Sequence, residues 1–232
     1  MSAVSMDSPS AERNKDPIWS VLSSKVLPSL TPSKTESEKT VVLRVLEIAA
    51  GCGVHTMHFT TQMVHQKIPV QWYPTDPHPP SRQAIQERID LAPSFEIQSS
   101  IQSPISLTLN EDGEEEGNNF DSWKGGEGIG FHLALCINMI HISPWEATIG
   151  LFRLAKEHLV PGGILYCYGP YKVDGKAVES NLAFDRSLKS RNSAWGVRDL
   201  ETVTKLAEEN GFQLEQTIEM PANNLSVLFK KI

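Results

Sequence analysis

The chain of 232 residues carries 21 Lys and Arg residues against 28 Asp and Glu residues, a formal net charge of −7 at pH 7. With 40% hydrophobic and 21% charged residues, it has the composition of a soluble globular protein long enough to bury a real core. The acidic balance and the absence of a basic run argue against nucleic acid as a partner, and no apolar stretch approaches the about 20 residues that a membrane-spanning helix needs.

Three widely spaced cysteines, Cys52, Cys136 and Cys167, form no CxxC pair. They are a poor disulfide framework and a poor zinc site. The polar, Ser-containing residues 1–16 lack the apolar core of a signal peptide. We therefore expect reduced thiols, no metal and a cytoplasmic location.

The first half of the chain predicts strands alternating with helices. Residues 1–40 are expected to form an N-terminal helical lid or extension with a helix at 17–27, where apolar residues recur at helical spacing. The nearly continuous apolar run up to Ile48 predicts a strand buried on both faces. The elements expected up to residue 109 are a strand at 40–48, a helix at 54–66, a strand at 70–73, a helix at 79–89 and a third strand within 95–109, best placed at 105–109.

The second half begins with an acidic, glycine-containing stretch at 110–130, expected to be a mobile surface insertion. Further strands and helices then follow. They are a strand at 131–139, a helix at 145–159, a strand at 164–168, helices at 177–191 and 197–210, and strands at 212–219 and 225–230.

This alternation predicts an α/β domain over residues 41–232, a doubly wound, mostly parallel sheet with helices on both faces. The last two strands are joined by a short link, which is too short for a parallel crossover. The sequence therefore predicts seven strands of which the last is reversed.

The strongest chemical pattern lies where the first strand gives way to its helix, in Glu47-Ile-Ala-Ala-Gly51-Cys-Gly53. Ligands of doubly wound sheets bind beyond the carboxyl ends of the strands, and glycines there allow the backbone to approach a ligand closely. Asp76 follows the second strand, where an acidic residue can hold ribose hydroxyls. The alternatives are a tight turn without a ligand for the glycines and a turn or helix-capping role for Asp76.

Two cofactor classes use this geometry. Nicotinamide cofactors favour GxGxxG, whose third glycine lets helix and strand pack closely, but Thr56 stands at that position. The acidic residue four positions before Gly51, the GxG pattern and the reversed last strand are instead similar to S-adenosylmethionine (SAM) methyltransferases.

Six ordered blocks of the sequence resemble one family, the methyltransferase-like protein 26 family, over nearly the whole chain. The blocks are SAERNKDPI at 10–18, VLEIAAGCGVHTMHF at 45–59, NMIHISPW at 138–145, YGPY at 168–171, WGVRD at 195–199 and MPANNL at 220–225. The resemblance implies a class I methyltransferase fold that binds SAM; the family supplies no substrate.

The resemblance also implies a set of cofactor contacts. Gly51 and Gly53 would approach the methionine and ribose of SAM, and Asp76 would hold the ribose hydroxyls. Glu47 belongs to the same turn. Asn110 stands where an acidic residue would contact adenine, and Asn138 and Met139 would line the cofactor from the end of the fourth strand.

Methyl transfer from a sulfonium mainly requires alignment and desolvation of two partners, and a general base helps when the acceptor is a hydroxyl. His141, just past the fourth strand, is the first candidate base; the alternative is a histidine that fixes the following loop. Arg13, Asn14 and Lys15 precede the expected first helix and could close over the site, where the two cations would bind or polarise a substrate.

Tyr168 and Tyr171 at the end of the fifth strand, together with Trp195 and Arg198, could form the wall of an acceptor pocket, or the aromatic rings could be core. The leading functional hypothesis is a SAM-dependent methyltransferase acting on a small molecule. The alternative is a cyclase, isomerase or pericyclic catalyst on the same fold, with Arg13, Lys15, His141 or the tyrosines as hydrogen-bond donors. A SAM-sensing module without turnover is a third.

Overall fold

The computed structural model describes residues 8–30, 41–111, 113–114 and 130–232. The chain divides into two compact units, one of residues 1–107 and 119–133 and the other of residues 108–118 and 134–232. Strand β5 (Phe131–Ile137) contributes residues 131–133 to the first unit and 134–137 to the second.

The first unit contains the strand order β2-β1-β5. β1 and β2 are parallel, with Leu43 opposite Val70 and Glu47 opposite Pro74. All but one residue of β1 are buried, as the continuous apolar run predicts. The elements of this unit are α1 (Pro9–Val21), α2 (Leu27–Leu30), β1 (Leu43–Ile48), α3 (Val54–His65), β2 (Val70–Pro74), α4 (Pro79–Asp90) and α5 (Phe95–Ser99).

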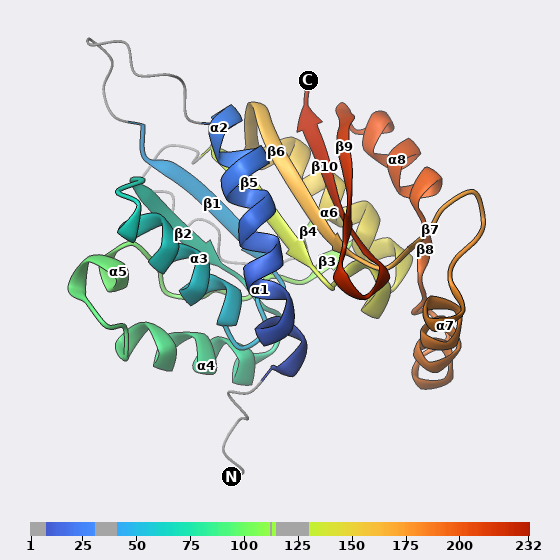
Figure 1. The fold of residues 1–232 in the computed structure, drawn as a ribbon, viewed down its shortest axis with the longest axis horizontal. Coiled ribbons are helices and arrows are strands. Elements are labelled where there is room, and N and C mark those ends of the chain that lie inside the picture. The colour runs from blue at the N-terminus through green and yellow to red at the C-terminus, as the bar shows by residue number, and fades with distance from the viewer. Residues whose placement is uncertain (1–7, 31–40, 112, 115–129) are drawn as a thin grey trace. The chain divides into compact units, whose positions relative to one another are not determined.

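The predicted start of the first helix, residue 17, is wrong. α1 begins at Pro9, a residue suited to the first helical turn because its missing N–H has no partner there, and Pro17 lies inside it. A π-helical turn, Leu22–Val26, links it to α2. α1 lies alongside α3 (Figure 1), and Trp19 stacks on Phe59 with ring centroids 6.2 Å apart.

The third predicted strand, at 105–109, is also wrong. Residues 95–99 form α5 instead, and the chain then follows β2 through two single parallel bridges, Trp72 with Ile101 and Thr75 with Ile105. Pro104 lies between these bridges and has no N–H to donate, so a continuous ladder cannot form. Over the described ranges, the central sheet accordingly has six strands rather than seven.

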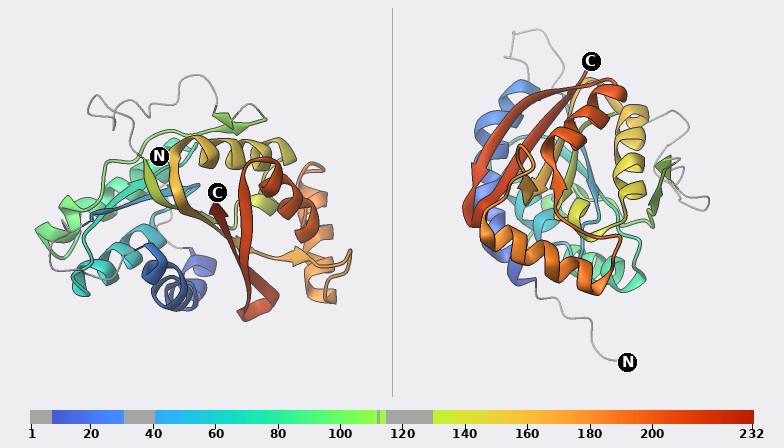
Figure 2. Two further views of the ribbon diagram at one scale, coloured as in Figure 1. Left: turned by 90° about the horizontal axis from the view of Figure 1, so that it is seen from above. Right: turned by 90° about the vertical axis from the view of Figure 1, so that its right-hand side faces the viewer.

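The second unit contains the order β5-β6-β10-β9, and β10 is antiparallel to both β6 and β9. The prediction of a mostly parallel α/β sheet with a reversed last strand is therefore confirmed. Both views of Figure 2 show the long, twisted β9–β10 hairpin. The elements are β3 (Leu109–Asn110), β4 (Gly113–Glu114), α6 (Trp145–His158), β6 (Leu159–Gly169), β7 (Tyr171–Lys172), α7 (Glu179–Arg191), β8 (Arg198–Asp199), α8 (Leu200–Glu209), β9 (Phe212–Met220) and β10 (Asn224–Lys231).

The core of this unit is built from the inner faces of its helices and sheet. Phe152 on α6 meets Phe212 and Phe229 edge-on, with ring centroids 5.9 and 5.3 Å apart. Such aromatic contacts add to the burial of the rings. The hairpin is thereby anchored to the helix that precedes β6.

Two sequence predictions fall largely outside the described residues. Of the expected insertion at 110–130, residues 112 and 115–129 are not described, and neither are residues 31–40 at the expected domain boundary. That boundary and the mobility of the insertion stay predictions. Within the described ranges, no helix is both long and apolar enough to span a membrane.

Candidate functional site

The turn after β1 contains two glycines, and each is favoured at its position for a different structural reason. Gly51 (φ +60°) and Gly53 (φ +79°) both adopt the left-handed region that favours glycine. A Cβ on Gly53 would lie 3.1 Å from Cγ1 and 3.3 Å from Cα of Ile85, so this glycine lets α4 approach, whereas a Cβ on Gly51 would meet no atom within 4 Å. Gly51 is therefore the glycine with open space beside it.

Asp76, just beyond β2, is joined to this turn. The Gly51 N–H donates to its Oδ2 at 2.9 Å, and the His78 N–H donates to its Oδ1 at 2.9 Å. Asp76 is buried, yet each carboxylate oxygen can accept a further hydrogen bond. The structure thus brings together the two groups that the sequence predicts at the carboxyl ends of β1 and β2.

Glu47 lies beneath the same turn and is buried. Its Oε2 accepts hydrogen bonds from Thr56 Oγ1 at 2.6 Å and Trp72 Nε1 at 2.7 Å, while no described residue donates to its Oε1. Burial raises the pKa of Glu47 to about 7; the two hydrogen bonds oppose this shift and the charge of Asp76 adds to it. The carboxyl is therefore divided between its acid and its ionised form near neutral pH.

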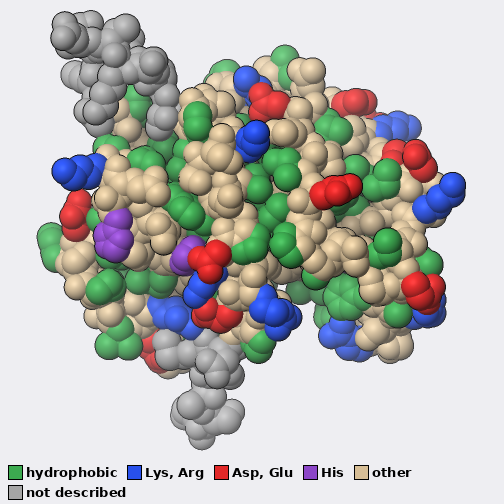
Figure 3. All heavy atoms as spheres, viewed as in Figure 1, with side chains coloured by type: hydrophobic (Ala, Val, Ile, Leu, Met, Phe, Trp, Pro, Cys, Tyr) green, Lys and Arg blue, Asp and Glu red, His purple; other side chains and the backbone are tan. Residues whose placement is uncertain are grey.

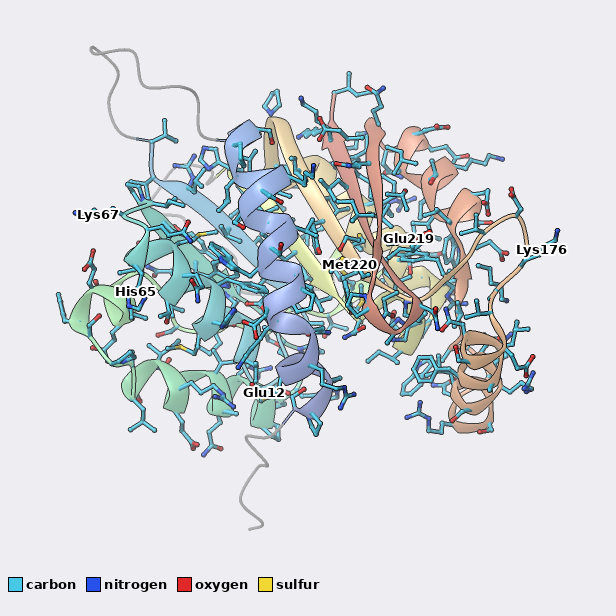
Figure 4. The ribbon with its side chains drawn as sticks, viewed as in Figure 1. Glu12, His65, Lys67, Lys176, Glu219 and Met220 are labelled. Carbon is cyan, nitrogen blue, oxygen red and sulfur yellow. The ribbon has the colours of Figure 1, made fainter. Side chains whose placement is uncertain are left out.

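The three expected residues of α1 point in different directions. Asn14 is buried, and its Oδ1 lies 2.7 Å from Nε2 of His55 on α3. Burial lowers the pKa of His55 to about 4, so the ring is neutral at pH 7 and donates to Asn14. Arg13 is exposed, and Lys15 pairs with Glu12 near the start of α1 (Figure 4). Asn14 thus fastens α1 to α3, while the two cations remain at the surface.

In the second unit, Asn138, Met139 and His141 follow β5. Asn138 has a positive φ of 61°, which asparagine tolerates better than most residues, and its N–H donates to the Tyr168 carbonyl at 2.8 Å. Met139 is buried. A non-glycine residue with a positive φ, such as Asn138 after β5, is common at functional sites.

His141 is packed against the end of β6. A Cβ on Gly169 would lie 3.0 Å from Nδ1 and 3.2 Å from Cε1 of His141, so the ring occupies the space that any larger residue would fill. The ring also meets Phe184 edge-on. Burial, with the charge of Arg198 assisting, lowers the pKa of His141 to about 4. The imidazole is therefore neutral at physiological pH, the form that can accept a proton.

Arg198 is engaged by the backbone around His141. Its Nη2 donates to the carbonyls of Ser143 and Ala194, each at 2.8 Å, and the Gly196 N–H donates to the His141 carbonyl at 3.1 Å. The guanidinium lies 5.8 Å from the centre of the Trp145 ring. These contacts make Arg198 a clamp that holds the loop before β8 against the turn that carries His141.

Sequence reasoning missed Asp185, which organises the same loop from α7. Its Oδ1 accepts from the Val197 N–H at 2.8 Å and its Oδ2 from Lys189 Nζ at 2.7 Å. The hydrogen bonds from Lys189 and Val197 and the charge of Lys172 lower its pKa against the opposing effect of burial. An aspartate within a polar helix carries no sequence signal of this role.

The remaining expected residues are distributed as follows. Tyr168 and Tyr171 are buried, and burial raises the pKa of Tyr171 well above its ordinary value, so its phenol stays neutral. Trp195 lies under the guanidinium of Arg191. Asn110 lies in β3 of the second unit, paired with Gly113 of β4.

Potential metal ligands are scattered among the described residues, and charges of both signs share one face of the molecule. Among the residues that the structure describes, no three His, Cys, Asp or Glu side chains gather as metal ligands. On the face drawn in Figure 3, Lys and Arg side chains are interspersed with Asp and Glu side chains. The described groups that could take part in chemistry include the carboxylates of the glycine turn in the first unit and the neutral His141 in the second.

Comparison with known proteins gives a family and a fold. A family model described as a protein of unknown function (DUF938) matches residues 5–231. An O-methyltransferase family protein from Burkholderia thailandensis is similar in structure, with a TM-score of 0.65 and 13% sequence identity over 94% of this chain and 56% of that one. Class I SAM methyltransferases thus share this α/β fold.

Two further solved structures show the same fold. A structure titled "A Pericyclic Reaction enzyme" has a TM-score of 0.60 and 16% identity over 88% of this chain and 46% of that one. LepI in complex with SAM has a TM-score of 0.61 and 17% identity over 91% of this chain and 48% of that one. The chain spans about half the length of these proteins.

Proposed function

The chain belongs to the DUF938 family, and we propose that it is a SAM-dependent methyltransferase acting on a small-molecule acceptor. The observation that carries the proposal is the hydrogen bond of 2.9 Å from Gly51 to Asp76, beside a glycine with no atom within 4 Å of its Cβ position. It is supported by similarity to an O-methyltransferase family protein and to LepI, which has been solved with SAM.

The residues of the turn fit this cofactor. The open space at Gly51 admits a ligand close to the backbone, and the carboxylate of Asp76, fixed by two backbone N–H groups, can accept further hydrogen bonds from ribose hydroxyls. Glu47 adds a buried oxygen that lacks a donor among the described residues, which an ammonium or amide of a ligand could satisfy. SAM would supply the methyl group at this place.

His141 fits the role of a general base. A hydroxyl acceptor must lose its proton as it is methylated, and a neutral imidazole can take that proton. The low pKa of His141, about 4, keeps the ring in the accepting form across the physiological range but also makes it a weak base. Methyl transfer from a sulfonium tolerates this, because alignment of the partners can supply a large part of the rate enhancement.

We also propose membership of the methyltransferase-like protein 26 family, a cytoplasmic location, and a small molecule rather than nucleic acid or a membrane as partner. The family and the location rest on the resemblance and the composition, and the exclusion of nucleic acid and membrane rests on the composition. The roles of Asn110, Asn138 and Met139 toward SAM, and of Arg13, Lys15 and Tyr171 toward the acceptor, belong to the same proposal.

A second candidate is a cyclase, isomerase or pericyclic catalyst that transfers no methyl group. The similarity to a pericyclic reaction enzyme of the same fold favours it. Such an enzyme would return a product of unchanged mass, whereas a methyltransferase releases demethylated SAM with every turnover. Mass spectrometry of the acceptor and cofactor after incubation separates the two.

Calorimetric titration of the purified protein with SAM and with its demethylated product tests cofactor binding. We expect saturable binding in the wild type and at least tenfold weaker binding in Asp76→Ala. Asp90→Ala, at an exposed aspartate at the end of α4, is the matched control and should bind as the wild type does. Binding of neither ligand to the wild type would refute the proposal.

A further inference from the structure

A pocket of about 460 Å³ opens within the second unit, between the β9–β10 turn and the segment from β7 to α7. This volume lies in the range typical of small-molecule sites. Its apolar wall includes Val173 and Val178, which are 44% and 49% exposed, although large β-branched side chains are usually buried. Met220 and Leu225 complete this wall from the hairpin. An apolar ligand would cover all four.

The polar wall of the pocket offers acceptors. The side-chain N–H₂ of Asn181 donates to the Asn223 carbonyl at 2.9 Å, and that of Asn224 donates to the Pro221 carbonyl at 3.1 Å. Because a carbonyl can only accept, these bonds fix the orientation of both amides. Their Oδ1 atoms accept from no described residue, so they are left for a ligand that donates.

The formal charges of the pocket cancel. Glu219, at the end of β9, and Lys176, on the segment before α7, both line it (Figure 4). An ion of either sign would meet one attractive and one repulsive side chain, so the pocket has no net charge that selects an anion or a cation. A neutral ligand needs no such selection.

The apolar wall of the pocket is connected to His141 by the pairing of β6 with β10. Leu225 lines the pocket and lies directly opposite Gly169 in the antiparallel β6–β10 pair. Directly opposite residues point to the same face, with Cβ positions about 5 Å apart. The Cβ position of Gly169 is in turn 3.0 Å from Nδ1 of His141. The apolar wall and the candidate base therefore share one face of the sheet.

We propose that this pocket binds a neutral, apolar alcohol or phenol, whose hydroxyl donates to the free Asn181 or Asn224 carbonyl oxygen and whose body covers Val173 and Val178. That this pocket is the acceptor site beside His141 rests on the proposed function. That it binds the alcohol or phenol does not, because residues of the second unit alone line the pocket.

Three probes with the same apolar body test the donor requirement: 4-propylphenol, 4-propylanisole, which lacks the donor, and 4-propylbenzoate, which is an anion. Each is titrated by NMR into protein with labelled Val and Leu methyl groups, in the absence of SAM. We expect 4-propylphenol to bind at least fivefold more tightly than the other two and to shift the methyl signals of Val173, Val178 and Leu225.

Val178→Lys places a charge and a longer chain in the pocket wall and should weaken binding of 4-propylphenol at least fivefold. The matched control is Val42→Lys, at a valine outside the pocket that is 46% exposed, which should bind within twofold of the wild type. Equal affinity for the three probes, tighter binding of the anion, or unchanged binding by Val178→Lys would overturn the proposal. Because SAM is absent from these titrations, its failure to bind in the calorimetric test would remove the methyltransferase function without touching this result.

Discussion

The buried carboxyl of Glu47 lies under an otherwise ordinary strand-to-helix turn. It keeps two hydrogen bonds on one oxygen and none from described residues on the other. Its neighbour Asp76 is tied to backbone N–H groups on both oxygens. Two carboxylates of one site therefore meet different environments, and burial raises the pKa of Glu47.

The pKa of Glu47 makes stability depend on pH. It rises from 4.5 to about 7 on folding, so between these values the unfolded chain ionises while the folded chain stays protonated, and stability falls as pH rises. The full cost, about 3 kcal/mol as an order of magnitude, is present above pH 7. Thermal unfolding should show Glu47→Gln gaining stability over the wild type from pH 5 to pH 8. An unchanged difference across this range, or the same gain in the exposed control Glu208→Gln, would contradict it.

His141 should titrate far below an ordinary histidine. Its pKa of about 4 results from burial and from Arg198, so its ring stays neutral as the pH is lowered from 8 to 5. NMR of protein with labelled histidine rings, with His141→Gln to assign the signal, measures this directly. A midpoint between pH 6 and 7 would show that the ring is more exposed than the structure has it.

At the scale of elements, Gly169 at the end of β6 leaves room for the ring of His141, which follows β5. Gly169→Ala places a methyl group 3.0 Å from His141 Nδ1, and such overpacking costs typically 1–3 kcal/mol. The free energy of unfolding in denaturant should fall by about that amount. In a His141→Ala background the same substitution should cost much less, and an equal cost in both backgrounds would exclude the clash as its cause.

α1 should depend on Asn14 for its attachment to α3. Removal of the partner leaves a buried imidazole N–H unsatisfied, at a cost of about 1–3 kcal/mol. Denaturant unfolding should therefore find Asn14→Ala destabilised by this amount. Arg13→Ala, on the exposed side of the same helix, should stay within about 0.5 kcal/mol of the wild type; equal effects would mean that α1 is not held by this bond.

The elements that sequence reasoning predicted are those whose local pattern agrees with their environment. β1 is mainly apolar and buried at all but one position, and the short link before β10 forces the reversed strand. The start of α1 was missed because the apolar residues of its first turns are few, and its inner face is completed by Asn14, a polar residue that pairs with His55 forty-one positions away.

Some of the candidate residues could likewise be predicted from the sequence, and others could not. Gly51 and Asp76 could be predicted because each lies in the turn that follows a strand, and the topology of parallel strands brings such turns together. The contacts of Arg198 and Asp185 could not be predicted, because these side chains bind backbone groups of distant segments. No pattern of neighbouring residue types marks such contacts.

At the scale of the whole molecule, we expect the folded chain to bind SAM. A ligand that binds only the native state stabilises it by roughly 2.7 kcal/mol at about 100 times its dissociation constant. For a chain of 232 residues this corresponds to about 5 to 10 °C in melting temperature.

The most direct measurement is thermal unfolding of the purified protein with saturating SAM, its demethylated product or NAD. We expect a shift of this size with SAM or its product, none with NAD, and a much smaller shift in Asp76→Ala than in the wild type. A shift with NAD alone, or none with any of the three, would contradict SAM binding at the glycine turn.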